Sequence, residues 1–436
     1  MERFDVVVVG ARCAGSPLAT MLARRGLRVC VLDRSRFPSD TLSTHVIQPC
    51  GVAVLGRLGV LDAVLGAGAV PLRWMTIAVE DARIDAEVDP GAFGAPALCV
   101  RRVTLDQLLV AASASAGAEV RTGTRVTSLI EEDGRVVGVE TERGPIHAAL
   151  VVGVDGRRST VATSVGAAEY HLAPPGRLFA WAYFEGAADT EGRLRLCRRG
   201  DLALLASPTD AGLYMAAVVP SLGVKDAFLA DREGSYMAGL RAWPELDDLL
   251  AGASRIGPIR VMTNWYGYFR EAVGPGWALL GDAGHFKDPS PAQGIADAFR
   301  QAEHLADAVE AGLGGGVGID EALGRWWRWR DQDAHEMHWF ATDMGAAGAS
   351  PPLATQVIRD IAGDNEATAK LLRVLNHEIR PSRLFRPGRL GKAAARAARD
   401  RPDQIPEMMR EVALALRNQV RRSRRSGRRG PVGRAA

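Results

Sequence analysis

The order of apolar and polar positions at the start of the chain predicts a strand, a helix and a second strand. Residues 4–9 form an apolar run rich in Val, which is typical of a strand buried on both faces. A Gly-containing loop follows, and residues 17–25 place apolar side chains on one face of a short helix that ends at Gly26. Residues 27–32 give a second buried strand. This order predicts a βαβ unit.

A different pattern occupies the middle of the chain. Residues 178–184, 202–206 and 213–219 are strand-like runs separated by turn residues, which predicts a mostly antiparallel sheet. After them, residues 277–280 return to a short buried strand and residues 294–309 follow a helical pattern. The first pattern is therefore interrupted and resumed, so we expect a discontinuous first domain with a second domain inserted into it.

The predicted fold class is α/β. It combines a Rossmann-like nucleotide-binding domain, an inserted, mostly antiparallel β-sheet domain that would hold a substrate, and a C-terminal helical region. We expect the parts at these residues: 1–175 plus 270–310 for the first domain, with part of 70–100 as a candidate for the sheet domain; 176–269 for the inserted domain; 311–416 for the helical region; and 417–436 for a basic, disordered tail.

Length and composition agree with a globular protein of two or three domains, since the chain has 436 residues. Apolar residues make up 47% and charged residues 24%, which excludes a chain that is mostly disordered or fibrous. No apolar run approaches the roughly 18 residues of a membrane helix, and the N-terminus lacks the pattern of a signal peptide. We therefore expect a cytoplasmic protein with no membrane partner.

Basic residues are concentrated at the C-terminus. The whole chain has 54 basic and 51 acidic side chains, a net charge of +3. Residues 417–436 contain eight Arg and no acid, so the rest of the chain has 46 basic and 51 acidic side chains and a net charge of −5. Such a segment can touch nucleic acid or acidic membranes, but it is more often a solvated tail. Because it has no aromatic residue to stack on bases, we expect no nucleic-acid partner.

The cysteines do not suggest a disulfide framework or a metal site. They are odd in number and contain no Cys-x-x-Cys pair: Cys13, Cys30, Cys50, Cys99 and Cys197. We expect most of them to be small buried apolar residues, and we expect no bound metal.

The segment Gly10-Ala11-Arg12-Cys13-Ala14-Gly15 lies between the first strand and the first helix. In a dinucleotide fold the first Gly permits a tight turn, the last allows close helix packing, and the helix N-terminus faces a pyrophosphate. Asp33 stands where an acid accepts hydrogen bonds from ribose hydroxyls. Arg12 replaces the second Gly, so we expect its side chain to point away from or along the pyrophosphate. For this segment alone, an ordinary strand-turn-helix without a ligand is the alternative.

Two further turns follow buried strands. One is Gly153-Val154-Asp155-Gly156-Arg157-Arg158-Ser159, and the other is Gly281-Asp282-Ala283-Gly284-His285. Each lies at the carboxyl end of a predicted strand, where open α/β sheets bind ligands. The three turns are therefore expected to meet at one edge of a sheet.

These turns, together with Arg102 at the start of a predicted helix, resemble the group A flavoprotein monooxygenases, the family with the para-hydroxybenzoate hydroxylase fold. The resemblance covers nearly all of residues 4–310. It implies an FAD cofactor, with Asp282 on its ribityl or ribose hydroxyls and Asp155 near the reduced nicotinamide. Arg102 would reach the FAD phosphates, with neighbouring Arg101 as a substitute. The residues that this resemblance and the loop pattern assign to the cofactor are Gly10, Arg12, Cys13, Ala14, Gly15, Asp33, Arg34, Arg102, Asp155, Gly156, Gly281, Asp282, Pro289, Gly294 and Ile295.

The segment 288–295 corresponds to the part of the family that covers the flavin ring, and it departs from the family pattern. Pro289 and Gly294 match, whereas Ala292 replaces a glycine and Ala296 a frequent asparagine. We still expect backbone N–H groups at Gly294 and Ile295 to approach the pyrimidine edge of the flavin and to stabilise negative charge on the reduced ring.

The chemistry that the resemblance implies needs few protein groups. We therefore assign few residues to catalysis and to substrate binding. His45 is the candidate catalytic residue, and Tyr214, Trp265, Tyr266 and His285 are expected to line the substrate cavity. Trp181 and Tyr183 stand two apart on a strand and therefore project from one face. Ordinary packing is the alternative for each of these residues.

The resemblance implies an FAD-dependent monooxygenase that uses NADH or NADPH and oxygen to hydroxylate or epoxidise an aromatic or polyketide-like small molecule. No second nucleotide-binding fingerprint appears, as expected of a family that binds the nicotinamide donor without a dedicated domain. One alternative is an FAD-dependent reductase of the geranylgeranyl reductase type, which acts on carbon–carbon double bonds. A second is a non-catalytic protein with a flavin fold. The Trp-x-Trp-x-Ile-Pro element of flavin halogenases is absent, and the oligomeric state is not assigned.

Overall fold

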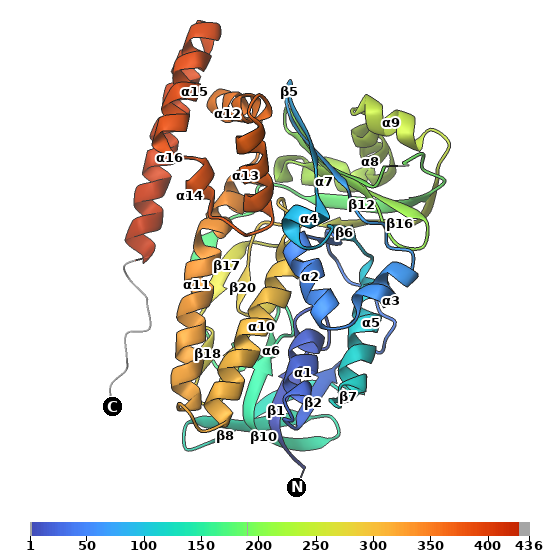
Figure 1. The fold of residues 1–436 in the computed structure, drawn as a ribbon, viewed down its shortest axis with the longest axis vertical. Coiled ribbons are helices and arrows are strands. Elements are labelled where there is room, and N and C mark those ends of the chain that lie inside the picture. The colour runs from blue at the N-terminus through green and yellow to red at the C-terminus, as the bar shows by residue number, and fades with distance from the viewer. Residues whose placement is uncertain (1, 190, 427–436) are drawn as a thin grey trace.

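Two large sheets and a set of C-terminal helices make up the computed structural model, which describes residues 2–189 and 191–426 (Figure 1). The first sheet has eight strands, the second has seven, and two small sheets lie between and beside them. The predicted α/β fold class is confirmed: a Rossmann-like sheet is combined with a mostly antiparallel sheet and a helical C-terminal region.

The first sheet is parallel at its centre. β1 pairs in parallel with β2 and β10, and β10 pairs in parallel with β19. Helix α1 (Gly15–Arg24) connects β1 to β2. The path along the sheet is β18 (Val273–Gly274), β19 (Trp277–Leu279), β10 (Gly144–Gly153), β1 (Arg3–Val9), β2 (Val29–Asp33) and β7 (Glu119–Thr122), and β8 (Val126–Glu132) and β9 (Arg135–Thr141) extend it antiparallel from β10.

Strand β1 is buried on both faces, which explains its continuous run of Val. Val6 and Val8 pack with Leu22 of α1 and with helices α10 (Gly294–Leu313) and α11 (Ile319–Met344). Val7 packs on the other face with Val151 of β10. The absence of polar alternation in the sequence is therefore a consequence of layers on both sides of the sheet.

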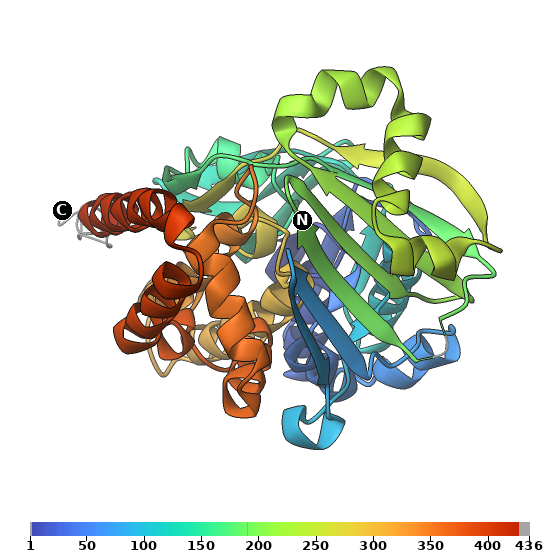
Figure 2. The same ribbon diagram turned by 90° about the horizontal axis from the view of Figure 1, so that it is seen from above.

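The second sheet is antiparallel except where β13 and β4 pair in parallel. Helices α7 (Lys225–Ala230), α8 (Arg232–Arg241) and α9 (Pro244–Leu250) cover one of its faces, as Figure 2 shows. The order of its strands is β16 (Ser254–Met262), β12 (Phe179–Glu185), β15 (Leu213–Pro220), β14 (Leu202–Pro208), β13 (Arg193–Arg199), β4 (Trp74–Val79) and β5 (Ala82–Glu87). Strands from residues 74–87 thus share this sheet with strands from 179–262.

Two small sheets and several short helices connect the large sheets. The small sheets are β11 (Glu169–Ala173), β17 (Gly267–Arg270) and β20 (His285–Phe286), and β3 (Val46–Ile47) with β6 (Leu98–Cys99). The connecting helices are α2 (Pro49–Arg57), α3 (Leu61–Gly66), α4 (Pro90–Phe93), α5 (Arg102–Ser115) and α6 (Thr160–Ser164). The five cysteines are all free, and four of them are buried.

The C-terminal region is helical for longer than the sequence predicts. The last helix, α16 (Ile405–Ser426), continues through residues 417–426, where we expected disorder; residues 427–436 of the expected tail lie outside the described residues. Within the described part of the chain, no helix is long and apolar enough to cross a membrane. The other helices here are α12 (Pro352–Ala362), α13 (Asn365–Leu375), α14 (Pro381–Leu384) and α15 (Pro387–Asp400).

Candidate active site

The turn after β1 fits closely against the turn after β10, and it does so because two of its residues are glycines. Gly10 has φ +113°, and a Cβ there would lie 2.6 Å from the carbonyl oxygen of Val154. A Cβ on Gly15 would lie 1.9 Å from the carbonyl oxygen of Gly10. Any side chain at either position would push the turn open.

The turn after β19 joins the same edge of the sheet. Gly281 has φ +60°, and a Cβ there would lie 3.0 Å from the Cβ of Ala14. The carboxyl ends of β1, β10 and β19 therefore bring the three predicted turns together. No side chain caps the N-terminus of α1, so its first N–H groups can bind an anion.

Asp33 holds the Gly-rich turn in shape. One of its carboxylate oxygens accepts a hydrogen bond from the Ala11 N–H at 2.9 Å, and the other accepts one from the Ser35 N–H at 2.7 Å. Neighbouring Arg34 is exposed. The carboxylate keeps free lone pairs, so the predicted hydrogen bonds to ribose hydroxyls stay a prediction.

Asp106, which sequence reasoning missed, connects the Gly-rich turn to helix α5. Its fully buried carboxylate is 2.7 Å from Nη1 of Arg12, 3.0 Å from Nε of Arg102 and 3.3 Å from Sγ of Cys13. Arg12 also donates to Oγ of Ser39 at 2.9 Å. Two guanidinium groups thus share one carboxylate, which leaves a net positive charge beside the turn. The spacing of Arg102 and Asp106, four apart on a helix, was the available signal.

Arg101 and Arg102 have different partners, although they are adjacent in sequence. The Arg101 guanidinium donates two hydrogen bonds to Asp210, at 3.0 and 2.9 Å. Burial favours a higher pKa for Asp210, but hydrogen bonds from Arg101 and Thr104 outweigh it, and the pKa is lowered. Arg101 therefore links α5 to the turn between β14 and β15, and Arg102 stays with the Gly-rich turn.

Asp155 and Asp282 both follow a strand, but their surroundings differ. Asp155 accepts a hydrogen bond from the Thr160 N–H at 2.6 Å at the start of α6, so it stabilises that helix. Asp282 is exposed although its neighbours Gly281 and Ala283 are buried. Desolvation raises the pKa of Asp282, with opposing effects of Arg157 and Arg102. Because Asp282 is exposed, a ligand's hydroxyl groups can reach its carboxylate.

The segment 288–295 forms a turn at the start of α10. The carbonyl oxygen of Pro289 accepts a hydrogen bond from the Ala292 N–H at 2.8 Å, and Ala292 has φ +53°. This left-handed conformation explains why a glycine is common here in the family, and it costs an L-residue about 1–2 kcal/mol. Gly294 is exposed between buried Gln293 and Ile295, and no side chain caps α10.

These features fit an FAD cofactor. The glycine turns leave room for a backbone approach to a pyrophosphate, the uncapped start of α1 supplies N–H donors, and Asp282 is placed to accept hydrogen bonds. Exposed Gly294 would present N–H groups of α10 to the flavin ring. When bound, FAD supplies the exchange of electrons with a nicotinamide donor and with oxygen.

An aromatic cluster lies beside the segment 288–295. Ala292 of this segment belongs to the same buried hydrophobic cluster as Trp181, Tyr183 and Trp265. The predicted projection of Trp181 and Tyr183 from one face is confirmed. Further members of the cluster are Phe179, Met215, Ala217, Val219 and Met337.

His45 is fully buried against this aromatic cluster and has φ +62°. Its Nε2 atom is 2.6 Å from the hydroxyl oxygen of Tyr183, whereas its Nδ1 atom has no hydrogen-bond partner. The Nε1 atom of Trp181, whose ring lies edge-on at 6.1 Å, also has no partner. Burial, together with the nearby charge of Arg102, lowers the pKa of His45 to about 3, so the imidazole is neutral at physiological pH.

The expectation that Tyr214, Trp265 and Tyr266 line one cavity is wrong. Trp265 is buried and packs edge-on against Phe179 and Phe286. Tyr214 lies on the opposite face of the second sheet, under α8 and α9, where its hydroxyl oxygen accepts a hydrogen bond from Arg195 at 2.9 Å. Tyr266 is 41% exposed and donates to Glu169. Alternation along a strand shows which side chains share a face of the sheet. It does not show which of the two faces is turned to the cofactor.

His285 is also placed away from the aromatic cluster. It stacks at 4.2 Å on Phe269 and lies 5.5 Å from the ring of His338 on α11. Burial and the nearby His338 lower its pKa well below the ordinary value. Because Phe286, the next residue of β20, points to Trp265, His285 points to the opposite side.

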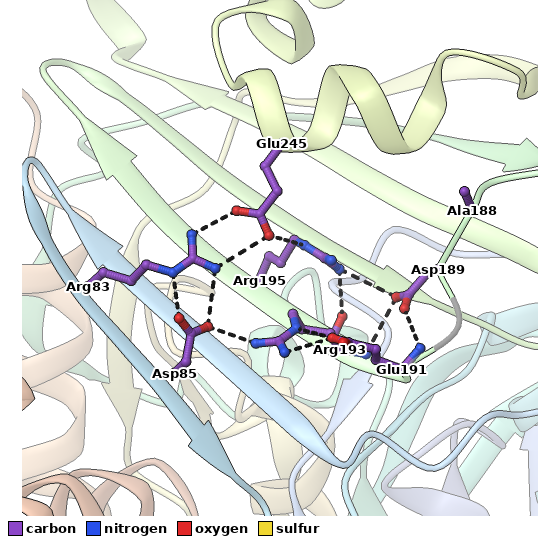
Figure 3. Close-up of a pocket in the computed structure, with 8 residues that line it drawn as sticks. All are labelled: Arg83, Asp85, Ala188, Asp189, Glu191, Arg193, Arg195 and Glu245. Atoms are coloured by element: carbon purple, nitrogen blue, oxygen red, sulfur yellow. Dashed lines mark hydrogen bonds and ion pairs between the residues drawn. The ribbon is translucent and has the colours of Figure 1, made fainter.

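A charged pocket of about 530 Å³ lies on the same side of the second sheet as Tyr214. Its side chains pair with one another: Arg83 binds Asp85 and Glu245, and Arg193 binds Glu191 (Figure 3). None of its lining residues belongs to the three turns or to the aromatic cluster, so this pocket is separate from the candidate site.

Comparison with known proteins agrees with this geometry. The family described as an FAD binding domain matches residues 3–184. A menaquinone reductase of Mycolicibacterium smegmatis is 29% identical over 71% of this chain and 77% of its own length. A 6-methylpretetramide 4-monooxygenase of Streptomyces rimosus is 28% identical over 68% of this chain and 73% of its own length.

The fold recurs in solved structures. A flavin-dependent brominase superposes with a TM-score of 0.74 at 18% identity, over 92% of this chain and 100% of the brominase. At that identity the likeness concerns the fold alone. The matched FAD binding domain and the sequence relatives identify the chain as an FAD-dependent oxidoreductase that is similar to the group A flavoprotein monooxygenases.

Proposed function

We propose that this enzyme uses NADH or NADPH and oxygen to hydroxylate or epoxidise an aromatic or polyketide-like small molecule. The observation that carries the proposal is the buried aromatic cluster that contains Trp181 and Tyr183 together with Ala292 of the segment 288–295. Such a cluster offers a largely apolar surface with a few polar anchors, as small-molecule sites do. The related 6-methylpretetramide 4-monooxygenase supports monooxygenation as the reaction.

The polar anchors in this proposal are His45 and Trp181. The Nδ1 atom of His45 and the Nε1 atom of Trp181 are buried without a partner, and an unsatisfied buried polar atom is costly unless a ligand pairs with it. The hydrogen bond from Tyr183 to Nε2 would leave Nδ1 of a neutral His45 as the donor towards a substrate oxygen. His45 would thus orient the substrate.

The cofactor in this proposal is held by the residues that meet at the first sheet edge. Arg102, Asp282 and the N–H groups of Gly294 and Ile295 would contact FAD directly. Asp33, Asp106 and Asp155 would hold the turns in position, because their carboxylates bind the protein itself.

Reduction of a carbon–carbon double bond is the second candidate function. The specific observation in its favour is the related menaquinone reductase, which covers as much of this chain as the monooxygenase does. The same aromatic cluster would bind an apolar alkene and keep water away from the transferred hydride.

Oxygen uptake separates these functions. The purified FAD-loaded protein would be supplied with NADH or NADPH, with and without a panel of phenolic and polyketide metabolites, and the apoprotein would serve as control. Uptake stimulated by a substrate, with a product heavier by one oxygen atom, supports monooxygenation. Donor oxidation coupled to alkene reduction without oxygen supports the reductase. A protein that does neither with any member of the panel contradicts the proposed substrate class.

A further inference from the structure

Helix α16 presents an apolar stripe to solvent. Ile405, Met409, Val412 and Leu416 are spaced four, three and four residues apart, which places them within an arc of about 60° on a helix. All four are exposed, Met409 by 68% and Leu416 by 58%. Large apolar residues so exposed on one helix face mark an interaction surface.

The stripe is not the face by which α16 is attached to the rest of the protein. Met408 is buried, and the Glu411 carboxylate accepts hydrogen bonds from the N–H groups of Leu353 and Ala354 at 3.0 and 3.1 Å. Arg422 binds Asp343 at 2.6 Å. Figures 1 and 2 show α16 along the outer side of the C-terminal helices. The stripe residues are exposed there.

The helix that carries the stripe is also basic. Arg410 and Arg417 are exposed on α16, and residues 417–436 contain eight Arg and no acid. The chain without residues 417–436 has a net charge of −5, although residues 380–401 also carry eight basic side chains against one acid, so positive charge is concentrated in the C-terminal helices. A partner that matches both properties has an apolar interior and a negative surface.

We propose that α16 docks the enzyme onto an anionic lipid surface, with the stripe inserted at the boundary between head groups and acyl chains. A helix with an apolar stripe beside a cluster of Arg binds such a surface in its plane, because apolar burial and attraction to anionic lipids add. This binding differs from membrane spanning, for which the described helices are unsuited.

The charge pattern favours lipid over the other occupants. A nucleic acid would pair with the Arg side chains but would leave the apolar stripe exposed. A second copy of this chain would cover the stripe, but it would bring another acid-free, Arg-rich segment near the first. An anionic bilayer satisfies both features at once.

Vesicle co-sedimentation of the full-length, FAD-loaded protein tests the proposal. We expect binding to vesicles that contain phosphatidylglycerol, little binding to pure phosphatidylcholine, and weaker binding as salt is raised. No binding to the anionic vesicles, or equal binding to both kinds, would overturn the proposal.

A matched pair of variants locates the binding face. Leu416 and Leu414 are both 58% exposed, but they stand two residues apart and therefore on opposite sides of α16. Leu416→Glu should lower vesicle binding at least roughly tenfold, and Leu414→Glu, which adds the same charge, should change it little. Equal losses in the two variants would show that the stripe is not the contact. A dimer of the wild type that Leu416→Glu dissociates would assign the stripe to a second copy and overturn the proposal. Flavin content and circular dichroism confirm that both variants are folded.

Discussion

Nη1 of Arg12 lies 2.7 Å from a carboxylate oxygen of Asp106, a residue 94 positions further along the chain. This ion pair joins the Gly-rich turn to helix α5, where Asp106 also binds Arg102. Arg12 therefore stands where the family pattern has a glycine, and its guanidinium is held by the protein. Its charge remains close to the turn, so it can still favour a bound pyrophosphate.

Substitution of the two partners should have unequal effects. Asp106→Ala removes the shared carboxylate and leaves two guanidinium groups unpaired, so we expect the free energy of unfolding to fall by about 3–5 kcal/mol, together with loss of FAD. Arg12→Ala leaves Asp106 paired with Arg102 and should cost less. Urea unfolding and flavin titration measure both effects. If Arg12→Ala were as destabilising as Asp106→Ala, the central role of Asp106 would be wrong.

Substitutions of the two acids that follow β10 and β19 should affect different properties, one the binding of FAD and the other the stability of the protein. Asp282→Ala should weaken FAD by about 1.5–3 kcal/mol, the value of a hydrogen bond to a charged group, and leave the apoprotein as stable as the wild type. Asp155→Ala should instead lower stability by about 1 kcal/mol through loss of the hydrogen bonds at the start of α6. Full flavin occupancy in the purified Asp282→Ala protein would contradict the assignment of this turn.

Two tyrosines on neighbouring strands provide a test of the substrate face. Tyr183→Phe removes the hydroxyl that binds His45, so we expect a changed KM or kcat for the substrate with unchanged FAD affinity. Tyr214→Phe, on the opposite face, is the matched control and should leave the kinetics unaltered. Trp265→Ala should raise KM, because Trp265 belongs to the aromatic cluster. If Tyr214→Phe changed the steady-state kinetics and Tyr183→Phe did not, the substrate would bind elsewhere.

Asp288 should make the stability of the protein depend on pH. Its carboxylate is buried beneath Gly345, where a Cβ would lie 1.9 Å from Oδ2, and burial raises its pKa from 3.8 to about 6. The native state therefore binds the proton more tightly than the unfolded state, and this contribution, fully present below pH 4, is lost as the pH rises to about 6.

Asp288→Asn keeps the oxygen that accepts hydrogen bonds from Ser290 and removes the charge. We expect equal stability of the two proteins near pH 4, and at pH 8 a gain of up to about 2–3 kcal/mol in the variant. Chemical unfolding across this pH range is the measurement. Parallel stability curves for the two proteins would mean that Asp288 is not protonated in the native state near pH 5.

The chain's local patterns were sufficient to predict the fold class and the turns of the cofactor site. The Val run of β1, the glycines at positions 10 and 15, and the acid of the third turn each depend on a few consecutive residues. Strand burial, tight turns and helix starts are short-range properties. The order of these motifs along the chain then matches the order in the family. The helix over residues 102–115 was likewise predictable, although its Asp106 was overlooked.

Only the tertiary structure decided which side chains share a site. Alternation along β15 showed that Tyr214 and Met215 face opposite sides, but the packing of α8 and α9 decided that Tyr214 points away from the aromatic cluster. The pairing of Arg12 with Asp106 spans 94 residues, and no local pattern reports a contact of that range. The Arg-rich end suggested a disordered tail because its charges repel. Contacts of Met408 and Glu411 with the body instead support a helix through Ser426 and turn its apolar stripe to solvent. Local sequence fixes the conformation of short segments, whereas long-range packing determines the faces they present.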